Sequence, residues 1–153
     1  MNSINPIKES HKDDLNWLFR TLNLLPRTVF ILSKFDEVAD IEEESDYKDN
    51  LQIKKDNVIK RLKDLININD NEIANLNIVG VSANPFDMGI EHWLSNINEF
   101  KKLSHIETLQ NATLNKVDKN GGLLVIANET NKTIIRDIFE KQVPISRQLN
   151  EKI

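Results

Sequence analysis

The stretch RTVFILSKFDEVAD, residues 27–40, decides how this chain folds. Within it, Val29–Leu32 is a run of β-branched and aromatic residues of the kind that forms a buried strand. Lys34 and Asp36 follow at once, where a strand more often gives way to a turn of Gly or Asn. A charged pair directly after a core strand indicates that this strand ends in a functional loop.

The flanking sequence predicts a parallel α/β arrangement. Helical patterns at residues 10–23, 45–66 and 87–98 alternate with the strand at 27–32 and a second strand, NIVGV, at 77–81. Elements in this order fit a parallel sheet with helices on its faces. Because right-handed crossovers bring the carboxyl ends of such strands to one edge, we expect the loops after Leu32 and Val81 to face the same crevice.

The pattern becomes helical throughout after about Leu103. Within this part, we expect Asp118–Gly121 to form a helix-ending turn and Pro144 to interrupt the last segment. Leu123–Ile126 is apolar on every side of a helix, which predicts that it is buried. The carboxyl-terminal part is therefore expected to be a helical segment that follows the α/β part.

Composition excludes several classes of function. The net charge of −4 does not suit a nucleic-acid-binding surface, which is normally basic. The absence of cysteine excludes disulfides and thiolate metal sites, and the three histidines have no metal-ligand spacing. No apolar run approaches the roughly 18 residues that a membrane span needs. We assign no catalytic residue and no metal ligand, and we expect a cytoplasmic protein.

The two loops carry side chains suited to recognising a planar base. The candidate site residues are Ser33, Lys34, Asp36, Ser82, Ala83 and Asn84. An aspartate in a dry crevice can accept two parallel hydrogen bonds from a donor edge such as that of guanine. A lysine can lay its aliphatic stem along the base, and a small Ser-Ala pair lets backbone N–H groups approach a carbonyl oxygen. The simpler alternative is a solvated ion pair between Lys34 and Asp36, worth less than about 1 kcal/mol.

These residues resemble the base-recognition motifs of P-loop GTPases. FILSKFDEVAD is similar to the [Asn/Thr]-Lys-x-Asp motif, and IVGVSANPF is similar to the later Ser-Ala-x motif. Longer stretches, among them NPIKESHKDDLNWLFRTL, resemble bacterial dynamin-like GTPases of the labile-enterotoxin-output type. The resemblance implies that residues 1–100 are the carboxyl-terminal half of a GTPase domain, with a partial Rossmann-like sheet. It implies that residues 101–153 begin the helical neck and stalk.

Two departures from the family pattern limit what this chain can do alone. Ser33 stands where the family has Asn or Thr, and no Gly-x-x-x-x-Gly-Lys-[Ser/Thr] motif occurs in the 153 residues. The resemblance therefore implies a fragment that carries guanine-recognition loops but is not catalytic by itself. GTP or GDP would bind in the intact parent protein, together with Mg²⁺, whose ligands this chain lacks. The parent would couple GTP hydrolysis to membrane-associated or vesicle-associated work in toxin secretion.

Expectations about partners follow from the same reasoning. We expect a homo-oligomer, contact with the missing amino-terminal half of the GTPase, membrane association only through the parent, and no nucleic acid. One alternative is a helical module for self-association or partner binding, in which the base loops are vestigial. A second alternative is an unrelated α/β domain with a fortuitous pair of motifs.

Overall fold

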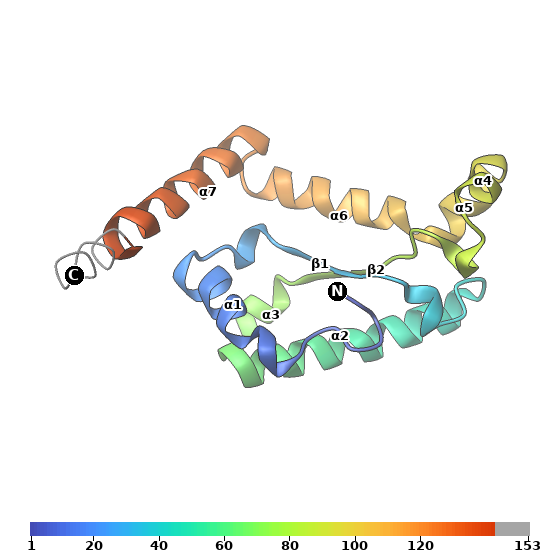
Figure 1. Cartoon of the computed structure of the whole chain (residues 1–153), viewed down its shortest axis with the longest axis horizontal. Helices are drawn as coiled ribbons and strands as arrows, with labels where there is room; N and C mark the ends of the chain where they lie inside the picture. Colours follow the sequence, from blue (N-terminus) through green and yellow to red (C-terminus); the bar gives the residue numbers. More distant parts are fainter. Residues whose placement is uncertain (143–153) are drawn as a thin grey trace, which may run out of the picture.

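A two-stranded parallel sheet lies at the centre of a mostly helical chain (Figure 1). The computed structural model describes residues 1–142. Strand β1 (Val29–Leu32) pairs with β2 (Asn77–Gly80) in parallel, with Phe30 opposite Ile78. This confirms the parallel pair of strands. Two strands do not establish a partial P-loop sheet, which stays a prediction.

The helices cover most of the described chain. They are α1 (Lys12–Asn16), α2 (Glu44–Ile66), α3 (Asp70–Ala74), α4 (Ile90–Ser95), α5 (Ile97–Ser104), α6 (Ile106–Lys119) and α7 (Leu123–Asp137), with short 3-10 or π-helical turns at Glu9–His11, Trp17–Thr21, Leu25–Arg27, Phe35–Glu37, Pro85–Asp87 and Ile138–Gln142. The long helix predicted at 45–66 is confirmed. A single helix at 87–98 is wrong, because Asn96 has non-helical angles (φ −132°, ψ 49°) and separates two shorter helices.

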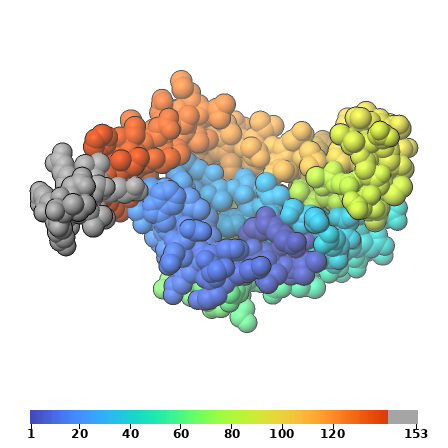
Figure 2. All heavy atoms as spheres, in the orientation of Figure 1, coloured from blue at the N-terminus to red at the C-terminus, as the bar shows by residue number. Residues whose placement is uncertain are grey.

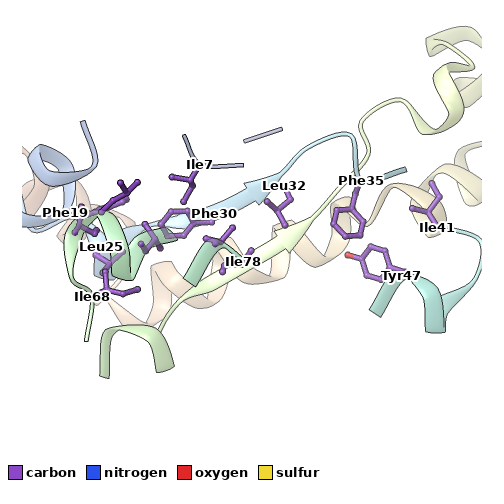
Figure 3. Packing of buried hydrophobic residues seen from close by; sticks show 14 of the residues in the cluster. Ile7, Phe19, Leu25, Phe30, Leu32, Phe35, Ile41, Tyr47, Ile68 and Ile78 are labelled. Carbon is purple, nitrogen blue, oxygen red and sulfur yellow. The ribbon is translucent and has the colours of Figure 1, made fainter. Parts of the chain in front are cut away.

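The sheet is covered on both faces, by α2 on one side and α6 on the other (Figure 1). Successive side chains of a strand point to opposite faces, so one strand can serve both layers. In β1, the side chains of Phe30 and Leu32 (Figure 3) are buried, and they belong to the same core cluster as Leu62 of α2. Burying each such side chain contributes roughly 1.5–3 kcal/mol, which is what holds α2 against the sheet.

A second group of aromatic contacts supports the loop that follows β1. Phe35 is fully buried, and its ring meets the ring of Tyr47 edge-on at 5.2 Å (Figure 3). The Tyr47 hydroxyl donates a hydrogen bond of 2.8 Å to the carbonyl oxygen of Gly80 at the end of β2. Burial raises the pKa of Tyr47 to about 12, so this donor stays protonated at neutral pH. Phe35 thus packs inward, between the polar residues Lys34 and Asp36.

The first residues of the chain run along the outer edge of β1. Asn2 forms a parallel bridge with Ser33, and the Ser33 amide donates to the Met1 carbonyl oxygen at 2.7 Å. These contacts pair backbone groups at the end of β1 that would otherwise form an open sheet edge. The edge of β1 is thus partly covered by the chain itself.

The prediction that Leu123–Ile126 is buried is wrong. Leu123, Leu124 and Val125 are 71%, 74% and 47% exposed. The reason is the position of α7, which runs beyond the end of the sheet and so has little protein to pack against (Figures 1 and 2). The predicted turn before α7 is confirmed, since α6 ends at Lys119 and Gly121 adopts φ 85°. Pro144 lies outside the described residues.

Candidate functional site

Asp36 joins the two predicted loops. Its Oδ1 accepts a hydrogen bond of 2.5 Å from the Ser82 hydroxyl, and its Oδ2 accepts one of 2.9 Å from the backbone amide of Phe86. Asp36 lies in the turn after β1, whereas Ser82 and Phe86 follow β2. The carboxyl ends of the two strands therefore meet at one edge, as the parallel topology predicts.

The carboxylate of Asp36 is held in place but keeps acceptor capacity. An ionised carboxylate has about four acceptor positions on its two oxygens, and the contacts from Ser82 and Phe86 use one on each oxygen. Ser82 is itself buried at 2% exposure, and its amide donates to the carbonyl oxygen of Ser104 at 3.0 Å. Asp36 is thus oriented by a buried partner, with one acceptor position on each oxygen left for a ligand.

Lys34 does not pair with Asp36. Its Nζ lies 3.4 Å from Oε1 of Glu37 in an ion pair whose lysine side chain is 66% exposed. Such an exposed pair contributes less than about 1 kcal/mol to stability, so the ammonium group of Lys34 can leave Glu37 for another partner at little cost. The backbone of Lys34 is left-handed (φ 56°), and its carbonyl oxygen accepts a hydrogen bond from the Ser3 hydroxyl. The alternative of a Lys34–Asp36 ion pair is therefore wrong.

Ser33 and Asn84 organise the loops themselves. The Ser33 hydroxyl donates to the Met1 carbonyl oxygen at 2.9 Å, which ties the amino terminus to the end of β1. The Asn84 side chain accepts from the Gly89 amide at 2.8 Å and donates to the Asp87 carboxylate at 2.9 Å. The structure thus engages these two side chains in loop contacts and leaves Lys34 and Asp36 as the polar side chains suited to a ligand.

Ala83 is the remaining candidate, and it presents its backbone. The residue is exposed, and its amide has no acceptor within residues 1–142. An exposed amide next to an oriented carboxylate can donate to a carbonyl oxygen of the same ligand. Beside Ala83 and Asn84 lies a hollow of about 800 Å³. It is lined mainly by apolar side chains of α4, α5 and the start of α6, including Ile90, Trp93, Leu94, Ile97, Phe100 and Ile106.

A stacked pair joins this site to α6. The imidazole of His105 lies parallel to the ring of Tyr47, with centroids 3.7 Å apart. Burial lowers the pKa of His105, and the nearby charge of Glu44 opposes that shift only in part. His105 has φ 55° and separates α5 from α6, directly after Ser104, which accepts from the Ser82 amide.

Sequence reasoning missed Phe86, Tyr47 and His105. Tyr47 and His105 are 58 positions apart, and no periodicity relates two such residues. The position of Phe86 directly after the Ser-Ala-Asn-Pro stretch was a partial indication that it belongs to the site, but its exposure could not be predicted from the sequence.

Within the described residues, no three His, Asp or Glu side chains group as a metal site. None of the helices described in residues 1–142 is both long and apolar enough to cross a bilayer. The groups of the candidate site that can contact a ligand are the carboxylate of Asp36, the side chain of Lys34 and the backbone amide of Ala83.

Comparison with known proteins identifies the family of this chain. A family model described as the dynamin-like helical domain matches residues 68–153, more than half of the sequence. The chain belongs to the dynamin-like helical domain family. The match begins before β2, so it also includes the second of the two candidate loops. The division of the dynamin-like chain near residue 100 stays a prediction.

A solved structure agrees with this assignment. The LeoA bacterial dynamin GTPase from ETEC is similar to this dynamin-like chain with a TM-score of 0.77 and 32% sequence identity. The similarity covers 99% of this chain and 27% of LeoA, so the chain spans about a quarter of that protein's length. No curated protein matches the chain.

Proposed function

We propose that this dynamin-like chain is the guanine-recognition part of a GTP-binding protein. The observation that carries the proposal is the 2.5 Å hydrogen bond from Ser82 to Asp36, because it brings together two loops that lie 46 positions apart in the sequence. A carboxylate with a buried partner is pre-oriented for a ligand, which lowers the entropic cost of binding. The similarity to a bacterial dynamin GTPase supports guanine as the ligand.

The free acceptor and donor positions match guanine. The base presents a ring N–H and an exocyclic amine side by side, and Asp36 retains one acceptor position on each oxygen for these two donors. The guanine carbonyl oxygen would accept from the exposed amide of Ala83. The Lys34 stem would lie along the base once its weak contact with Glu37 is released. Ser82 positions the carboxylate, and Ser33 and Asn84 shape the two loops.

Phosphate chemistry would belong to residues outside this sequence. The 153 residues contain no phosphate-binding loop, and positioning of phosphates and Mg²⁺ is what accelerates phosphoryl transfer. In our proposal this chain binds and orients the base of GTP or GDP, while the rest of the parent supplies the phosphate loop and the Mg²⁺ ligands. The resemblance to labile-enterotoxin-output proteins further suggests vesicle-associated work in toxin secretion for that parent.

Replacing Asp36 with asparagine tests the proposal. The amide offers one donor and one acceptor, so it fits xanthine, whose carbonyl replaces the guanine amine. An unmade hydrogen bond in a desolvated site costs roughly 1–3 kcal/mol, or about five- to a hundredfold in affinity. Titration of the chain with guanosine and xanthosine, followed by NMR, is expected to show preference for guanosine in the wild type and for xanthosine in Asp36→Asn. Equal preference in the two proteins would remove Asp36 from the base site.

A second function, self-association through α7, is favoured by a separate observation. The apolar side chains of α7 and the turn after it are exposed, among them Leu124 at 74%, Ile135 at 52% and Phe139 at 67%. Apolar side chains gathered on one helix mark a surface that another protein element covers. We propose a second copy of this chain as the partner, and we propose that a membrane is reached only through the parent.

A further inference from the structure

Phe86 is held in an unfavourable conformation beside the candidate base site. Its backbone is left-handed (φ 57°, ψ 17°), and Asp87 next to it also has φ 57°. A left-handed conformation is uncommon for any side-chain-bearing residue, and for a bulky aromatic residue it is an outlier. Strain of this kind persists only where surrounding contacts enforce it, and it is concentrated at functional sites.

Those enforcing contacts are present on both sides of Phe86. Pro85 is buried, and its carbonyl oxygen accepts from the indole Nε1 of Trp93 at 3.2 Å. On the other side, the Asn84 side chain bonds both the Gly89 amide and the Asp87 carboxylate. The loop is therefore fixed around Phe86, and the strain is built into the fold.

The strain does not serve to bury the ring. The Phe86 side chain is 46% exposed, although the preceding Pro85 is buried. Its backbone amide lies 2.9 Å from Oδ2 of Asp36, so the residue that carries this ring contacts the carboxylate directly. A half-exposed aromatic residue next to a hydrogen-bonding carboxylate can bind the face of a planar base while the carboxylate binds its edge.

We propose that Phe86 is the residue on which the purine base held by Asp36 stacks. This inference rests on the proposed function, since it concerns the same site. Stacking acts on the face of any base, whereas hydrogen bonds from Asp36 read its edge. Phe86 therefore sets the affinity for the base, and Asp36 sets the choice between bases.

The division of roles is tested by titrating the full chain and its variants with guanosine and xanthosine. Removing an aromatic stacking partner lowers affinity for a base roughly five- to a hundredfold. We expect Phe86→Leu to weaken guanosine binding by such a factor. The same change in an Asp36→Asn background is expected to weaken xanthosine binding by the same factor, because stacking involves the face of the base and not the edge at which guanine and xanthine differ. Phe86→Tyr keeps the ring and is expected to bind as the wild type does.

Trp17→Leu is the matched control, because Trp17 is an aromatic residue that is 44% exposed, close to the 46% of Phe86, and lies in the Trp17–Thr21 turn before β1. Ring currents from a stacked phenyl ring are expected to shift the guanosine H8 resonance upfield with the wild type and Trp17→Leu, and not with Phe86→Leu.

Three results would overturn the inference, and they are distinguishable. Wild-type affinity and an unchanged H8 shift in Phe86→Leu, with binding lost in Asp36→Ala, would leave Asp36 in the base site and remove Phe86. No guanosine binding by the wild type would refute the proposed function and the stacking role with it. If Phe86→Leu lowers the mass in light scattering but leaves guanosine affinity unchanged, Phe86 belongs to a protein interface.

Discussion

Replacing Gly80 with alanine is expected to disturb the loop that carries Asp36. A Cβ at position 80 would lie 2.7 Å from Cδ2 and 2.9 Å from Cγ of the Phe35 ring. The first distance is about 0.7 Å short of the 3.4 Å at which ordinary contact begins. Phe35 is fully buried and packs against Tyr47, so its rigid ring cannot simply rotate away. Overpacking of this kind costs roughly 1–3 kcal/mol.

A double-mutant cycle isolates the clash. Phe35→Leu replaces the rigid ring with a smaller side chain that can turn away from the new methyl group, at a cost of its own of roughly 1–2 kcal/mol for the space left behind. If the contact is the cause, the Gly80→Ala, Phe35→Leu protein is more stable than the sum of the single changes predicts, by about 0.5–3 kcal/mol. Urea unfolding at one fixed protein concentration measures this, because association would otherwise alter the apparent stability.

Phe19→Leu serves as the matched control. Phe19 is also buried, but it packs against Phe30 at the opposite end of the core from Phe35 (Figure 3). Its combination with Gly80→Ala is expected to be additive within about 0.5 kcal/mol. The reasoning would be refuted if the changes in free energy of unfolding were additive in both double mutants. It would also be refuted if the Gly80→Ala protein were as stable as the wild type. Guanosine affinity is expected to fall in Gly80→Ala, since Asp36 directly follows the displaced ring.

Three further predictions concern catalysis, pH and assembly. The purified chain is expected not to hydrolyse GTP, and phosphate release above a buffer blank would contradict this. Burial lowers the pKa of His105 in the folded state, so the unfolded chain takes up the proton first as the pH falls. The free energy of unfolding should therefore decrease below about pH 6.5, the ordinary pKa of histidine. His105→Phe should make the free energy of unfolding depend less on pH in this range. If the pH dependence is unchanged in His105→Phe, other groups cause it. Light scattering should give at least twice the mass of 17.7 kDa, and Leu124→Lys with Ile135→Lys should return it to one chain; a wild-type monomer would exclude association through α7.

The local sequence was sufficient to place the main elements. The β-branched and aromatic run at 29–32 and the apolar run at 77–80 form strands because such residues suit a pleated surface covered on both sides. The apolar spacing of 44–66 marks a helix, since its side chains recur on one face. The order of the elements and the right-handed crossover between the parallel strands then bring the two loops to one edge of the sheet. The meeting of Asp36 and Ser82 was predictable for this reason.

Contacts between distant residues were decided only in the tertiary structure. Composition shows that Leu123–Val125 is apolar, but burial also requires a neighbouring surface, and α7 has none of sufficient extent within the described chain. The roles of Ser33 and Asn84 as loop-organising residues depend on backbone groups that the folded loops bring near them. The exposure of Phe86 depends on bonds that hold it left-handed. Sequence periodicity reports which face of an element is apolar, whereas only the packed chain determines what lies against that face.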